Sequence, residues 1–100
     1  MESLSREQII NELQGNFQSY IDKYGIDDIG IFEEEGQDDI YYIGYTIKKS
    51  GETYHLHSTF RKNNNELTPI NHLWSIESDD PQGEDLTGFE DIESALHQIK

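Results

Sequence analysis

The stretch from Asp39 to Lys62 places the strongest constraint on the fold of this 100-residue chain. It reads DIYYIGYTIKKSGETYHLHSTFRK and is the longest segment in which apolar and polar residues alternate with the two-residue period of a β-strand. A Ser-Gly pair at its centre is typical of a two-residue hairpin turn. The segment therefore predicts two antiparallel strands joined at Ser50-Gly51.

A turn at this position fixes the register of the hairpin, because Lys49 then lies opposite Glu52. One face is predicted to carry the pairs Ile47–Tyr54, Tyr45–Leu56, Ile43–Ser58 and Tyr41–Phe60. The other face is predicted to carry Lys48–Thr53, Thr46–His55, Gly44–His57 and Tyr42–Thr59. Opposed aromatic and β-branched side chains stabilise a sheet by roughly 0.2–1 kcal/mol a pair. A slip of one residue would turn the apolar set outward, so we expect a strongly specified register.

Size and composition indicate a single domain over residues 1–100, long enough to bury a core without metals or disulfides. The absence of cysteine excludes a disulfide framework, a thiolate nucleophile and a Cys-based zinc site. The N-terminal residues lack the basic and apolar segments of a signal peptide, and no apolar run approaches the roughly 20 residues of a membrane span. We therefore expect a soluble, cytoplasmic protein.

Charge is the strongest compositional feature, since 21 acidic residues against seven basic ones give a net charge of −14. Nucleic acids and anionic membranes are bound through Lys and Arg, so we expect the chain to bind neither. The acidity has two interpretations. One is solubility and resistance to association. The other is a negative surface shaped for a basic partner, with imitation of nucleic acid as one form of it.

The first element is predicted to be a long helix from Ser5 to Lys23. Ser5 and Gln8 form a capping box, and apolar residues recur at helical spacing through Tyr24. Glycine at position 15 weakens the helix by about 1 kcal/mol, but we expect the apolar stripe to outweigh it. Gly25 is the expected left-handed residue that ends the helix.

A strand is predicted at Ile29–Glu35, and its register with the next strand is left open. A two-residue turn at Gly36-Gln37 places Phe32 beside Tyr41 on the core face. A three-residue loop instead turns Ile29 and Ile31 inward, and we prefer it slightly because it buries more aliphatic surface.

The last elements are a fourth strand at 71–78, because Pro69 disfavours a central strand beginning at Glu66, and a short helix at 90–99. The predicted fold is α+β, in the order α-β-β-β-β-α. Short connections favour a four-stranded antiparallel meander with both helices on one face and the other face open to water.

The clearest candidate for a metal site is His55-Leu56-His57. Residues two apart on a strand share a face, so both imidazoles can reach one ion, and His72 on the next strand is a candidate third ligand. The alternative is that these histidines simply lie on the solvated side of the sheet. No resident cofactor is predicted.

A second candidate site is the non-core face of the hairpin, which mixes aromatic, hydroxyl and cationic groups. Binding surfaces favour several of these residue types. The residues are Tyr42, Thr46, His55, His57, Thr59 and Arg61.

The remaining polar clusters do not point to chemistry. The acidic runs at 33–39 and 79–85 lack the ligand spacing of a calcium loop, so they are interpreted as solvated turns. The sequence contains no nucleophile elbow, no zinc-protease motif and no phosphate-binding glycine loop. We therefore expect a protein that is not an enzyme.

Three segments together resemble a family of short acidic proteins of unknown function from endospore-forming Gram-positive bacteria. They are YGIDDIGIFEEE (24–35), YYIGYTIKKSGETYHLH (41–57) and WSIESDDPQGEDLTGFEDIESAL (74–96). The resemblance covers nearly the whole chain and implies a bacterial, cytoplasmic setting. It implies no activity and no site residues.

The sequence thus predicts a monomeric, non-enzymatic protein-interaction module with a partner that is basic in character. A metal or small-ligand binder that uses the histidines is one alternative, and an inhibitor that mimics nucleic acid is another.

Overall fold

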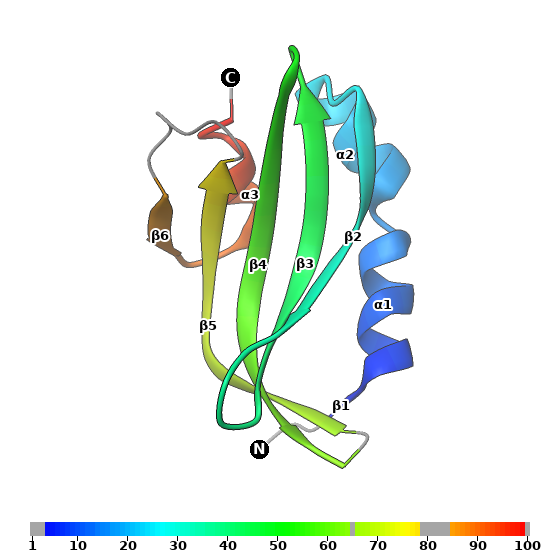
Figure 1. Ribbon diagram of the computed structural model, residues 1–100. Helices are drawn as coiled ribbons and strands as arrows, with labels where there is room; N and C mark the ends of the chain where they lie inside the picture. The colour runs from blue at the N-terminus through cyan, green and yellow to red at the C-terminus, as the bar shows by residue number, and fades with distance from the viewer. Residues whose placement is uncertain (1–3, 65, 79–84, 100) are drawn as a thin grey trace.

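The computed structural model describes residues 4–64, 66–78 and 85–99, without the side chains at 71 and 72. Figure 1 shows a twisted antiparallel sheet with helices packed on one of its faces. The elements, in chain order, are β1 (Leu4–Ser5), α1 (Arg6–Gln14), α2 (Phe17–Tyr24), β2 (Asp28–Glu35), β3 (Ile40–Lys49), β4 (Glu52–Asn63), β5 (Glu66–Ser78), β6 (Leu86–Phe89) and α3 (Ile92–Leu96).

The four predicted strands form the expected meander, in the order β5-β4-β3-β2. The sheet nevertheless has six strands in the described part of the chain, so the prediction of four was wrong. Both additional strands pair with β5, β1 near its beginning and β6 near its end. The last strand of the meander is therefore covered by a further strand near each of its ends.

The central hairpin, β3–β4, has the predicted register at every pair from Lys49–Glu52 to Tyr41–Phe60. Ser50 and Gly51 both have positive φ angles, of 54° and 83°. Two successive positive angles define the type I′ turn, whose twist matches that of the flanking strands. The local turn signal and the alternation of apolar residues therefore determined this hairpin together.

The first hairpin, β2–β3, turns Ile29 and Ile31 toward the core, as the preferred three-residue loop predicted. Its register is shifted by two residues from that prediction, because five residues rather than three separate the last pair, Glu35 and Tyr41. The observed pairs are Ile29–Ile47, Ile31–Tyr45 and Glu35–Tyr41. Phe32 consequently lies on the opposite face, across from Gly44.

Strand β5 begins at Glu66, earlier than predicted, and contains Pro69. The ladder with β4 is irregular there, since the register shifts between Ser58 and Phe60. A bulge is a position where a sheet tolerates proline, because a ladder hydrogen bond is already missing. The strand therefore continues through the proline.

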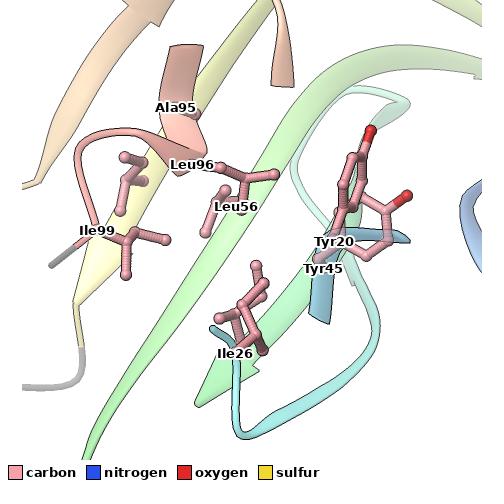
Figure 2. Close-up of a cluster of buried hydrophobic side chains, with 9 residues drawn as sticks. Tyr20, Ile26, Tyr45, Leu56, Ala95, Leu96 and Ile99 are labelled. Atoms are coloured by element: carbon pink, nitrogen blue, oxygen red, sulfur yellow. The ribbon is translucent and has the colours of Figure 1, made fainter. Parts of the chain in front are cut away.

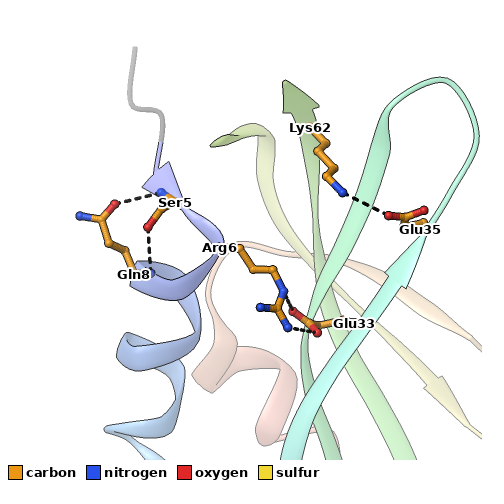
Figure 3. Close-up of polar contacts among 6 residues, drawn as sticks. All are labelled: Ser5, Arg6, Gln8, Glu33, Glu35 and Lys62. Atoms are coloured by element: carbon orange, nitrogen blue, oxygen red, sulfur yellow. Dashed lines mark hydrogen bonds and ion pairs between the residues drawn. The ribbon is translucent and has the colours of Figure 1, made fainter. Parts of the chain in front are cut away.

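The predicted long N-terminal helix is divided into α1 and α2 at Gly15-Asn16. The capping box is confirmed: Ser5 Oγ accepts from the Gln8 N–H at 3.2 Å, and Gln8 Oε1 accepts from the Ser5 N–H at 2.9 Å (Figure 3). Gly25 ends α2 in the left-handed conformation, as expected, with φ of 65°.

At the break between the helices, a backbone carbonyl accepts a hydrogen bond from a side chain of the sheet. Leu13 O accepts a hydrogen bond from the Asn16 N–H at 3.2 Å and another from the Tyr45 hydroxyl at 2.8 Å. In a continuous helix that carbonyl would pair with the N–H of Phe17. Because Tyr45 is fully buried, its hydroxyl needs a protein partner. The break supplies one.

The core lies between the sheet and the helices and consists of two clusters. The larger one joins α2, α3 and the upper sheet through Tyr20, Tyr45, Leu56 and Leu96 (Figure 2). The smaller one joins α1 to the lower sheet and consists of Ile9, Tyr41, Ile43, Phe60 and Leu67.

The C-terminal helix α3 is shorter than the predicted 90–99, because it begins after Asp91, whose carboxylate caps the Ser94 N–H at 2.7 Å. Leu96 of this helix and Ile99, which lies beyond its end, are both buried in the core. The expectation that the helices share one face of the sheet is also confirmed, since α2 and α3 lie behind the strands in Figure 1.

Candidate functional site

The face of the sheet opposite the helices, here called the open face, carries all six predicted binding residues. Side chains alternate along β3 and β4, so residues between the core positions point the other way. Thr46 lies opposite His55, and Tyr42 lies opposite Thr59. Arg61 pairs with Ile40 at the far end of the hairpin, where its side chain is exposed.

Four aromatic rings gather on the open face around Gly44. Phe32 and His57 lie on either side of this glycine, which has no side chain to separate them. The ring of Phe32 lies 5.7 Å from His57 and 4.9 Å from His55, and Tyr42 lies 5.0 Å from His57 in an edge-on arrangement. We call Phe32, Tyr42, His55 and His57 the aromatic cluster.

His57 is buried, with 7% of its surface exposed, although it lies on the face that was predicted to be open to water. Its Nε2 lies 3.3 Å from Oε1 of Glu77 on β5. Its Nδ1 is also buried and makes no hydrogen bond within the described residues. The ring is covered because Phe32 and Tyr42 lean over it. The interpretation of both histidines as solvated side chains was therefore wrong for His57.

His55 is half-buried and makes a polar contact across the hairpin. Its Nδ1 lies 3.0 Å from the hydroxyl of Thr46, the residue opposite it on β3. This contact and the neighbouring Phe32 ring hold the imidazole in one orientation. His55 and Glu77 are also cross-strand partners, so one carboxylate lies beside both histidines.

The predicted metal ligands are only partly brought together. His55 and His57 share a face and both touch Phe32, but His57 directs Nε2 to Glu77 and buries Nδ1. The side chain of His72 lies outside the described part of the structure. Within that part, no group of three or more His, Asp and Glu side chains is arranged to hold a metal ion.

Comparison with protein families identifies the chain over nearly all of its length. The model of a family of unknown function, DUF5634, matches residues 3–99. The chain belongs to DUF5634. The resemblance to a family of unknown function is thus confirmed. No curated protein matches this member of DUF5634, and the family description names no activity or ligand.

Several acidic residues of this DUF5634 chain, on β2 and on α3, are engaged in ion pairs. Glu33 accepts from the Arg6 guanidinium at 2.6 and 2.8 Å, and Glu35 accepts from Lys62 at 3.2 Å (Figure 3). Glu93 of α3 pairs with Lys23 and accepts a hydrogen bond from Tyr24 at 2.9 Å. These contacts hold the pKa of Glu93 below its usual value.

The predicted acidic turns are only partly described. Asp38 and Asp39 both have positive φ angles in the connection between β2 and β3. Asp85 is exposed, whereas Asp79, Asp80 and Glu84 lie outside the described residues. No helix within 4–64, 66–78 and 85–99 combines the length and apolar character that crossing a bilayer requires.

Sequence reasoning missed two residues of the open face, Phe32 and Glu77. Phe32 was missed because the register of the first hairpin was left open. The signal that could have indicated Phe32 is Gly44, a glycine in the middle of a strand with tyrosines nearby on both sides in the sequence. Aromatic side chains on neighbouring strands often cover such a glycine. Nothing in the sequence placed Glu77 beside His57.

Proposed function

We propose that this DUF5634 protein is a non-enzymatic interaction module of the bacterial cytoplasm that binds another protein through the open face of its sheet. The observation that supports the proposal best is the aromatic cluster, which lies on the sheet face that carries no described helix. Aromatic side chains are enriched in interfaces because they offer large, rigid contact areas. The sequence also contains no catalytic motif.

The polar surroundings of the cluster favour a partner with basic groups. Glu34 pairs with Tyr42 across the strands, and Glu77 pairs with His55, so carboxylates flank the rings on the two strands beside the hairpin, β2 and β5. The net charge of −14 would also attract a basic protein from a distance. We expect the aromatic rings to provide the contact area and the carboxylates to orient the partner.

A pull-down with a variant of the open face tests this proposal. The bait is the tagged chain, the wash is a salt gradient, and captured proteins are identified by mass spectrometry. The open-face variant is Tyr42→Ser/Thr59→Lys. The control, Gln18→Ser/Ser19→Lys, makes the same change in charge at exposed positions of α2. Circular dichroism establishes that all three baits are folded.

A stoichiometric partner that the wild type and the control retain, and that the open-face variant loses, would support the proposal. Equal retention by all three folded baits would contradict it, as would the lack of any stoichiometric partner of the wild type. If the open-face variant fails to fold, the single variant Thr59→Lys replaces it, with Ser19→Lys as its control, because this change leaves the four rings of the aromatic cluster in place.

We also propose that the protein is a monomer. Among the described residues, strand β2 forms a free edge of the sheet, and it ends in three consecutive glutamates, Glu33 to Glu35. Charged side chains on an edge strand oppose pairing with a second copy. Light scattering after gel filtration should give the mass of one chain, and the mass of a dimer would contradict this.

A metal or small-ligand site on the open face is the second candidate. It is favoured by the contact of His55 and His57 with one phenylalanine ring, which makes the two imidazoles neighbours. It has less support, because both nitrogens of His57 are buried or engaged. Calorimetry with zinc chloride at neutral pH tests it: heat that His55→Ala abolishes would support the site, and no heat at millimolar zinc would end the idea.

Imitation of nucleic acid requires carboxylates along one continuous face. The described acidic residues are instead spread over the helices, both sheet faces and the turns, and three of them pair with Arg6, Lys23 and Lys62. This arrangement gives the nucleic-acid alternative no support.

A further inference from the structure

The helix-bearing face of the sheet contains a groove at the junction of the two core clusters. Helix α1 covers the lower sheet, while α2 and α3 cover the upper sheet (Figure 1). Between α1 and α3 lies a cavity of about 390 Å³. Its lining includes Ile9, Leu13, Phe60, Pro69, Trp74 and Ile92.

A second hollow, of about 370 Å³, continues this groove past α3. The two share Phe60, Pro69, Trp74 and Ile92, so they form one depression rather than two sites. Trp74 and Ile92 are only partly buried by the chain itself. An apolar depression in which a tryptophan remains partly exposed is a typical place for the apolar side chains of a partner to insert.

The rim of the groove is acidic. Glu12 borders it on the α1 side, and Glu90 with Asp91 border it on the α3 side. All three residues are exposed, and the described lining residues include no Lys or Arg. The backbone N–H of Ser94 keeps the pKa of Asp91 below its usual value, which further favours the ionised carboxylate. The groove thus combines an apolar floor with negative charges on both sides of its rim.

We propose that this groove is a docking site for a segment of a partner protein that presents apolar side chains flanked by lysine or arginine. The apolar side chains fill the groove over Trp74, and the cationic groups pair with Glu12, Glu90 and Asp91. A second copy of this chain does not suit the site, because its net charge of −14 would bring acid against acid. The groove and the open face lie on opposite sides of the sheet, so this site is independent of the one proposed above.

The chain contains a single tryptophan, and it lies in the groove. The emission of Trp74 therefore reports occupancy without any label. The probe is a synthetic amphipathic peptide of leucine and lysine. Two matched peptides serve as controls: in one, glutamate replaces lysine, and in the other, serine replaces leucine. We expect a saturable change in Trp74 emission with the leucine–lysine peptide alone.

Charge-reversal variants distinguish the groove from a general attraction to an acidic protein. Glu12→Lys/Glu90→Lys should weaken binding of the leucine–lysine peptide by about tenfold, because it removes two attractions and adds two repulsions. The control Glu52→Lys/Glu66→Lys changes the net charge equally at exposed positions elsewhere, and we expect it to stay within about twofold of the wild type.

Three results would overturn the proposal. They are no change in Trp74 emission at millimolar peptide, equal weakening by both double variants, and equal binding of the serine–lysine peptide. The variant Tyr42→Ser/Thr59→Lys should bind the leucine–lysine peptide normally. The two proposals can therefore fail separately: evidence against binding at the open face would not contradict docking in the groove, and evidence against the groove would not contradict the open face.

Discussion

At Gly44, strands β3 and β4 approach so closely that a methyl group has no room. A Cβ atom on this residue would lie 1.8 Å from the carbonyl oxygen of Leu56 and 2.8 Å from the Cα of His57. Both are backbone atoms, so they cannot move aside as a flexible side chain would. The same glycine lets Phe32 and His57 meet above it. One residue thus sets both the spacing of the central hairpin and the shape of the open face.

The variant Gly44→Ala should lower the free energy of unfolding by at least about 2 kcal/mol, because the strands must separate to admit the methyl group. Urea denaturation measures the change. Gly30→Ala is the matched control: it lies opposite Thr46 on the neighbouring strand, and its Cβ would have no atom within 4 Å. We expect the control to be neutral or slightly stabilising, and similar losses in both variants would refute the steric explanation.

Tyr45 of β3 is the second residue of this kind, because it joins the sheet to both α1 and α2. It is fully buried, and its ring packs edge-on against Phe17 and Tyr20 of α2. Its hydroxyl donates to Leu13 O at 2.8 Å. Burial raises the pKa of the phenol above its ordinary value of 10.0, because an ionised tyrosine would lose its hydration there.

The raised pKa of Tyr45 predicts a loss of stability in alkali. Above pH 10 the unfolded chain releases the phenolic proton while the folded protein keeps it, so the free energy of unfolding falls as the pH rises. Tyr45→Phe should make this fall less steep and should cost about 1 kcal/mol at neutral pH through the lost hydrogen bond. Part of the fall should remain, because burial also raises the pKa of Tyr20. Denaturation from pH 8 to 11 tests this; an unchanged slope would contradict it.

Among the elements, the broken N-terminal helix shows how tertiary contacts override local preference. Gly15 has helical angles, with φ of −62° and ψ of −18°, so the break does not arise from a conformation that only glycine adopts. The better explanation is the sheet beneath it, since the Tyr45 hydroxyl holds the Leu13 carbonyl that would otherwise continue the helix.

This explanation predicts that alanine is tolerated at position 15. Its Cβ would lie 3.5 and 3.6 Å from the carbonyl oxygens of Glu12 and Asn11, which are ordinary contacts. Gly15→Ala should therefore raise the free energy of unfolding by about 0.5–1 kcal/mol, as expected for glycine replaced in a helical conformation. Thermal and urea denaturation measure it. A loss of stability would show that the glycine itself is needed at the break.

Elements whose signals are local were predictable from the sequence, and elements held by distant partners were not. The β3–β4 hairpin has its turn, period and cross-strand pairs within one segment, so its register was predicted in full. Strand β1 consists of two residues that exist as a strand only because β5 lies beside them. Strand β6 has four residues, with the positive-φ Gly88 among them, and it lacks an alternating pattern.

The same distinction applies to the candidate site. Membership of the open face follows from the alternation along β3 and β4, and all six residues were placed there correctly. The burial of His57 depends on Phe32 from β2 and on Glu77 from β5. The position of Phe32 depended on the loop between β2 and β3, whose length could not be predicted from the sequence. The contact of His57 with Glu77 depended on the irregular pairing of β4 with β5.

For the whole molecule, the dominant electrostatic effect is repulsion within a chain of net charge −14. The pairs of Arg6, Lys23 and Lys62 with glutamates are partly or fully exposed, and such pairs stabilise proteins little. Salt should therefore relieve more repulsion than it removes attraction.

We expect the melting temperature to rise by a few degrees between about 10 mM and about 200 mM NaCl, over which the screening length falls severalfold. Differential scanning calorimetry measures it. KCl should have the same effect, which separates screening from the binding of a particular ion. A melting temperature that falls with salt would mean that the ion pairs outweigh the repulsion.

The attachment of β1 and β6 to the same strand has a consequence for the order in which the molecule is completed. Leu4 pairs with Leu67, and Ile9 of α1 packs with Phe60 and Leu67. During synthesis β1 and α1 leave the ribosome before their partners in β4 and β5, which follow about 50 residues later in the chain. The central hairpin, by contrast, can close as soon as its own turn is available. Strand β1 is therefore made before β5 and yet cannot pair until β5 is available.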